Sequence, residues 1–135
     1  MVNVFFTEGY SPRVAFWFLY VEIIVSLRTD YKKMNTQIFE NIRTLKRQLL
    51  PDDRMILFGS QARGDAREDS DWDLLVLLNK PRKEESDEDK AYQFALMGWD
   101  YGTYLSVKLY TEIEWEKGKM FPFYKNVERE GIEIN

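Results

Sequence analysis

The segment that most constrains the fold is residues 71–78, which read DWDLLVLL. Beyond the two aspartates every side chain is apolar on both faces of an extended strand, and such strands are typical of the centre of a covered sheet. A shorter apolar run at residues 54–58, RMILF, predicts a second buried strand that Gly59 and Ser60 close. We therefore expect a small sheet that other elements cover.

A helix is expected before the first strand. Thr36 is a good N-cap residue, and Pro51 marks the end of the helix. Between them, apolar residues recur at spacings of four, three and four, which places them on one helical face: Ile38, Ile42, Leu45 and Leu49. Such a face is typical of a helix that packs on a core.

Three further elements are expected after the central strand. Ser86 is followed by three acidic residues and predicts the N-cap of a helix that stops at Gly102. Residues 104–110 are rich in strand formers and predict a third strand. Thr111 then opens a capping box, which predicts a short helix that ends at Gly118.

The order of these elements predicts the fold class. Helix, strand, strand, helix, strand and helix follow one another, and residues 132–134 are expected to add an edge strand. We therefore expect an α/β or α+β domain in which helices flank a small mixed sheet. With 135 residues, the chain has room for one such domain.

Composition excludes several classes of function. The chain has no histidine and no cysteine, which removes Ser-His and Cys-His nucleophile pairs, thiolate metal sites and disulfides. Any metal would be a hard cation bound by carboxylate oxygens. The formal net charge of -4 does not favour direct binding to nucleic acid. The lack of cysteine fits a reducing compartment, so we expect a cytoplasmic protein.

Residues 1–33 differ in character from the rest. Residues 14–27, VAFWFLYVEIIVSL, are apolar except for one glutamate and one serine, but they are too few to span a bilayer, and no signal-peptide cleavage site follows them. We expect no membrane association. The segment either forms an amphiphilic helix or strand that packs on the domain or a partner, or it precedes a native start at Met34. We therefore treat residues 1–33 as an extension and residues 34–135 as the functional domain.

Gly59, Ser60, Asp71 and Asp73 have the features of a phosphate and metal site. A glycine after a strand lets a phosphate approach the backbone, and a helix that begins at Ser60 or Gln61 would offer free amide groups. In a strand, Asp71 and Asp73 project from the same face and can converge on one cation. Mg²⁺ or Mn²⁺ with nucleotide phosphates suits such a pair. These groups are the minimum for nucleotidyl transfer.

The stretch of residues 59–78, GSQARGDAREDSDWDLLVLL, resembles the signature of the nucleotidyltransferase superfamily that includes DNA polymerase beta. It looks most like the minimal nucleotidyltransferase (MNT) domains of prokaryotes. The likeness covers roughly residues 36–117 and includes the Gly-Ser pair, the Arg-Gly pair, a serine and the Asp-x-Asp pair at matching spacing. The resemblance implies a polymerase beta palm-like fold.

The same resemblance implies roles for individual residues. Gly59 and Ser60 would contact the nucleotide phosphates, and Asp71 and Asp73 would be the catalytic metal ligands. ATP is the implied substrate, with Mg²⁺ or Mn²⁺ as the cofactor. Arg63 either binds the triphosphate or pairs with nearby acidic side chains.

A third carboxylate is also implied by the resemblance, from the strand that follows the central one. The expected strand reads YLSVKLY and has no acidic residue, so Ser106 or Lys108 stands at that position. We interpret Glu114 as a helix-capping residue and Glu112 as a first-turn acid. Asp100 reaches the site only if its helix ends beside it. Catalytic activity is therefore a separate question from family membership.

The MNT resemblance further implies a partner, a HEPN-domain ribonuclease toxin, and an antitoxin role for this chain. The reaction it implies is transfer of AMP from ATP to a tyrosine of that toxin. A chain this short is expected to take its acceptor from a second protein, in a homo- or hetero-oligomer. Two alternatives stay open: a catalytically weak or inactive antitoxin that masks its partner sterically, and a nucleotidyltransferase that modifies a small hydroxylated molecule.

Overall fold

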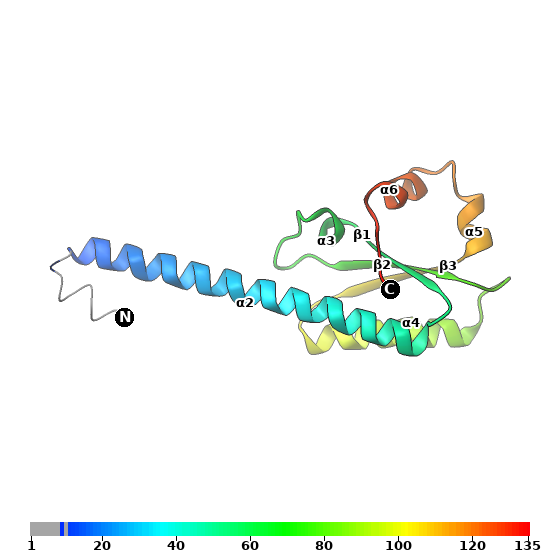
Figure 1. Cartoon of the computed structure of the whole chain (residues 1–135), viewed down its shortest axis with the longest axis horizontal. Coiled ribbons are helices and arrows are strands. Elements are labelled where there is room, and N and C mark those ends of the chain that lie inside the picture. The colour runs from blue at the N-terminus through cyan, green and yellow to red at the C-terminus, as the bar shows by residue number, and fades with distance from the viewer. Residues whose placement is uncertain (1–8, 10) are drawn as a thin grey trace. The chain divides into compact units, whose positions relative to one another are not determined.

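The computed structural model describes residue 9 and residues 11–135. The chain divides between Gln37 and Ile38 into two compact units. The second unit is built on a four-stranded mixed sheet (Figure 1). Its strands are β1 (Arg54–Phe58), β2 (Trp72–Leu78), β3 (Leu105–Thr111) and β4 (Ile132–Glu133), in the spatial order β3-β2-β1-β4.

Strand pairing confirms the predicted sheet. β2 pairs antiparallel with β1 and parallel with β3, so it lies in the interior of the sheet, as its apolar run predicted. β4 pairs antiparallel with β1 and forms the predicted edge strand. The domain is a mixed α/β fold with a mixed sheet, as expected.

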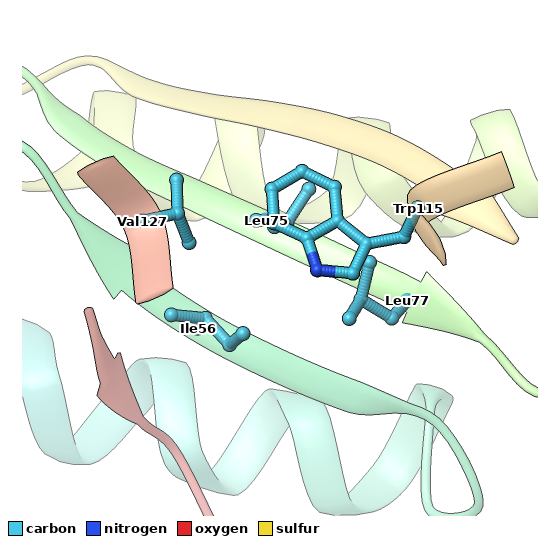
Figure 2. Close-up of a cluster of buried hydrophobic side chains, with 5 residues drawn as sticks. All are labelled: Ile56, Leu75, Leu77, Trp115 and Val127. Atoms are coloured by element: carbon cyan, nitrogen blue, oxygen red, sulfur yellow. The ribbon is translucent and has the colours of Figure 1, made fainter. Parts of the chain in front are cut away.

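Helices cover both faces of this sheet. Residues 38–49 of α2 (Pro12–Leu49) and α4 (Glu85–Asp100) lie on one face, and α5 (Glu112–Lys117) and α6 (Pro122–Glu130) lie on the other (Figure 1). On the α5/α6 face, a cluster of buried apolar side chains joins β1 and β2 to both helices (Figure 2): Ile56, Leu75, Leu77, Trp115 and Val127. Alternate residues of β2, such as Leu74 and Val76, are fully buried on the opposite face.

Helix α2 ends before Pro51 as predicted, but it begins at Pro12 and not at Thr36. Thr36 lies inside the helix, and its hydroxyl donates to the backbone carbonyl of Lys32. The predicted N-cap was wrong because a cap residue marks a helix start only where the preceding residues leave the helix. No glycine or proline interrupts residues 13–35, so the helix continues through them.

Residues 12–37 of α2 belong to the first unit and are described by themselves. They are helical, which decides between the helix and the strand expected there. Many of their large apolar side chains are exposed: Val14, Phe16, Trp17, Tyr20, Ile23, Ile24, Val25 and Leu27. In the part of the chain that the structure describes, no helix is long and apolar enough to cross a membrane.

The start of α4 also differs from the prediction. Glu84, not Ser86, is the N-cap residue, and its backbone amide donates to the carboxylate of Asp87 over 2.8 Å. Asp87 is buried and also contacts Lys80, with 2.8 Å between Nζ and Oδ2, so an ion pair with the preceding loop supports the capping box of Glu84 and Asp87. The predicted stop is confirmed: Gly102 follows the helix with a φ of 67°, which favours glycine.

The two helices on the other face differ in how well the sequence predicts them. α5 opens with the predicted capping box: the Thr111 hydroxyl accepts from the Glu114 amide over 3.1 Å, and the Glu114 carboxylate accepts from the Thr111 amide over 2.8 Å. The patterns above do not predict α6. Pro122 in its first turn and Gly131 after its last turn are nevertheless typical helix boundaries.

Candidate functional site

A tight turn connects β1 to the short helix α3 (Ser60–Arg63). Gly59 forms this turn with a φ of 74° and a ψ of -157°, a conformation that essentially only glycine adopts. Gly59 is the N-cap residue of α3, and the amides of Ser60 and Gln61 lie in the first turn, where helix amides have no partner within the helix. The turn therefore presents backbone donors beside the end of a strand, as the sequence predicted.

The Gly59 turn is in close contact with Asp73. Phe58 at the end of β1 pairs with Asp73 of β2, so the residue after Phe58 lies beside the Asp73 side chain. A Cβ atom on Gly59 would lie 2.5 Å from Oδ2 of Asp73 and 3.3 Å from its Cγ. Because such contacts are too short, glycine is the residue that lets the turn and the carboxylate lie side by side.

Asp71 and Asp73 stand at the start of β2. Asp73 is the second residue of the strand and is half-buried, whereas Asp71 precedes the strand and is exposed. Burial raises the pKa of the Asp73 carboxyl, and the negative charge of Asp71 raises it further. The positive charges of Lys108 and Arg63 act in the opposite direction. Burial and the neighbouring Asp71 therefore outweigh these two positive charges at the Asp73 carboxyl.

Paired carboxylates are a type of ligand that hard divalent cations prefer. A cation between Asp71 and Asp73 would remove their repulsion, and Mg²⁺ takes one or two protein carboxylates together with phosphate oxygens and water. Within residues 9 and 11–135, no group of three or more His, Cys, Asp or Glu side chains could hold a metal.

Strand β3 supplies no third carboxylate beside the pair. Ser106 lies opposite Asp73 in the parallel register, and Lys108 follows two residues later on the same face. Glu114 is occupied in the capping box of α5, as interpreted from the sequence. Asp100 lines a cavity between α2 and α4. The acid that the resemblance implied is thus replaced by a hydroxyl and a lysine.

Arg63 pairs with acidic side chains. Its guanidinium contacts Asp65 at 3.3 Å and Glu130 of α6 at 3.2 Å, and the Arg63 side chain is 44% exposed. Asp65 was one of the neighbours expected for this arginine, whereas the contact with Glu130 required α6 and was missed. Exposed ion pairs contribute only about 0–1 kcal/mol to stability. A bound triphosphate could therefore replace these partners.

Comparison with known proteins identifies the family. A family model described as a nucleotidyltransferase domain matches residues 39–133, which is more than half of the chain. The chain belongs to this nucleotidyltransferase family. The match includes the Gly59 turn and both aspartates, and it confirms the resemblance to the polymerase beta-like superfamily. Comparison with curated proteins gives no match.

The nucleotidyltransferase domain also shares its fold with a solved structure, described as the crystal structure of the toxin-antitoxin with AMP-PNP. The TM-score is 0.52 at 17% sequence identity, and the similarity covers 72% of each chain. At this identity the similarity shows a common fold. Nucleotidyltransferases of this family typically use a nucleotide and a divalent metal, and the groups around Asp73 suit both.

Proposed function

We propose that this nucleotidyltransferase transfers AMP from ATP to a hydroxyl group of a partner protein. The contact between the Gly59 turn and the Asp73 carboxylate carries the proposal, since it brings backbone donors for phosphate next to a carboxylate pair for a cation. In the proposed site Gly59, Ser60 and Arg63 bind the triphosphate. Asp71 and Asp73 hold Mg²⁺ or Mn²⁺.

The proposed reaction is an in-line displacement at phosphorus. The acceptor oxygen bonds to the α-phosphorus of ATP, the bond from that phosphorus to the β-phosphate bridging oxygen breaks, and pyrophosphate leaves with the electron pair. The hydroxyl proton passes to solvent. The amides of α3 and the Ser60 hydroxyl hold the triphosphate, while Gly59 keeps the approach open. A bound cation would offset the phosphate charge and lower the pKa of the acceptor hydroxyl.

The acceptor in this proposal is a tyrosine of a HEPN-type toxin, for which the chain is the cytoplasmic antitoxin. Support comes from the fold that the domain shares with a toxin-antitoxin structure and from the MNT-like motif at residues 59–78. A tyrosine hydroxyl has a pKa of about 10, so it needs activation before it attacks. The absence of a third carboxylate from β3 makes this activation the most sensitive part of the proposal.

A binding module is the second candidate. Strand β3 has no acidic residue beside Asp73, and residues 12–37 of α2 expose several large apolar side chains. Extended exposed apolar surface is typical of interaction sites. In this second function the chain covers its partner sterically and transfers nothing.

One experiment separates the two candidates. The protein is incubated with α-labelled ATP, Mg²⁺ and the product of the neighbouring gene, in parallel with an Asp71→Asn, Asp73→Asn double variant. Asp69→Asn, an exposed acid in the same loop, is the matched control. Label on the partner with the unchanged protein and with the control, but not with the double variant, supports transfer.

The remaining outcomes contradict transfer to a partner. A stable complex without label in all three samples would support steric masking instead. Label on a low-mass acceptor, in the absence of any partner protein, would indicate a nucleotidyltransferase that acts on small molecules.

A further inference from the structure

Lys108 shares one face of the sheet with Asp73. β3 runs parallel to β2, with Ser106 opposite Asp73 and Lys108 opposite Leu75. Side chains two residues apart in a strand point to the same face, so these four residues all lie on the α5/α6 face. β3 is at the edge of the sheet, and Lys108 is exposed there.

Lys108 is an available cation beside the carboxylate pair. It lies two residues beyond Ser106, the residue opposite Asp73, and on the same face of the sheet. Across residues 9 and 11–135, no hydrogen bond or salt bridge engages the Lys108 ammonium. Lys80 and Lys83, in contrast, are each held by carboxylates. Lys108 can therefore bind a ligand without first breaking an ion pair.

The net charge of the proposed site depends on this lysine. Asp71 and Asp73 with one divalent cation are neutral, and Lys108 gives the set one positive charge. A third carboxylate in place of Lys108 would require a second divalent cation to reach the same charge. Because a triphosphate carries several negative charges, a positive set binds it more tightly than a neutral one.

We propose that Lys108 binds the triphosphate of the nucleotide and that the site therefore holds one divalent cation. The triphosphate is then held from both neighbours of β2, by Gly59 and Ser60 after β1 and by Lys108 from β3. This inference rests on the nucleotide site of the proposed function, but it does not depend on transfer to an acceptor.

Binding of AMP-PNP in the presence of Mn²⁺, followed by titration calorimetry, tests the inference without any transfer step. Lys108→Gln should weaken AMP-PNP binding about 10-fold, as expected for the loss of one charge-assisted hydrogen bond. Lys108→Arg should retain most of the affinity because it keeps the charge. Lys117→Gln, at an exposed lysine of α5, is the matched control and should bind like the unchanged protein. Electron paramagnetic resonance should count one bound Mn²⁺ per chain at saturating AMP-PNP.

Equal affinities of Lys108→Gln and Lys117→Gln, or two Mn²⁺ ions per unchanged chain, would overturn the inference. If Lys108 only protects the sheet edge, Lys108→Gln will self-associate in size-exclusion chromatography with unchanged affinity, which also overturns it. An unchanged protein that binds no AMP-PNP refutes both the inference and the proposed function. Lys108-dependent binding without label transfer refutes the transfer alone.

Discussion

Replacing Gly59 by alanine tests two separate reasons for glycine in the turn. The backbone at φ 74° and ψ -157° costs a residue with a Cβ atom about 1–3 kcal/mol. The new methyl group would also lie 2.5 Å from Oδ2 of Asp73, and overpacking of this kind costs about 1–3 kcal/mol. The Asp73 carboxylate is the end of a side chain and can turn away, which favours the lower part of the second range. We expect Gly59→Ala to lower the free energy of unfolding by about 2–4 kcal/mol.

Gly64→Ala is the matched control for this variant. Gly64 has a φ of 83° and a ψ of 12°, the ordinary left-handed region, and nothing lies within 4 Å of the place where its Cβ would stand. A loss of about 1 kcal/mol is expected from the backbone alone. Urea unfolding followed by tryptophan fluorescence measures both losses. Equal losses in the two variants would refute the contact between Gly59 and Asp73 as a constraint.

The same pair of variants distinguishes an effect on folding stability from an effect on cation binding. Alanine at position 59 displaces the Asp73 carboxylate, so Gly59→Ala should bind Mn²⁺ more weakly than Gly64→Ala at temperatures where both are folded. Unchanged Mn²⁺ binding by folded Gly59→Ala would contradict the proposed placement of the cation at Asp71 and Asp73.

Three further predictions follow from packing and charge. The folded-state pKa of Asp73 is raised, mainly by burial and then by Asp71, so its negative charge opposes folding at neutral pH. In the absence of metal, Asp73→Asn should therefore unfold at a higher urea concentration than the unchanged protein. Mg²⁺ should no longer stabilise this variant. Burial alone would raise the pKa of Asp87, but hydrogen bonds from Lys80 and a backbone amide lower it. The ionised Asp87 carboxylate therefore stabilises the fold above the ordinary aspartate pKa of about 3.9, and this stabilisation is lost as the pH falls through the lower pKa of the folded state. Asp87→Asn should be less stable than the unchanged protein at pH 7, and its stability should depend less on acid pH. Urea midpoints measured across pH test this. Trp115→Ala removes the largest side chain of the cluster in Figure 2 and should cost about 3–5 kcal/mol in urea unfolding; a loss below 1 kcal/mol would contradict its burial.

Short-range patterns predicted much of this domain correctly. The Gly59 turn and the Thr111 capping box involve groups a few residues apart, so both are visible in the sequence. The equally local patterns at Thr36 and Ser86 failed. At Thr36 the preceding residues continue the helix. Near Ser86 a capping box between Glu84 and Asp87, which Lys80 also contacts, starts the helix earlier. A cap motif therefore predicts a helix start only where the neighbouring residues do not favour another start.

In the candidate site, too, some features follow from the sequence and others depend on the tertiary structure. The order of residues 59–73 is enough to predict the Gly59 turn, the placement of both aspartates at the start of a strand and the family, because spacing along two strands carries that information. Which charges surround Asp73 depends on tertiary structure: the parallel register brings Lys108 to its face, and α6 brings Glu130 to Arg63. Strand register and helix docking are set by packing between residues far apart in the chain, so the charge around the aspartates is visible only once the chain has folded.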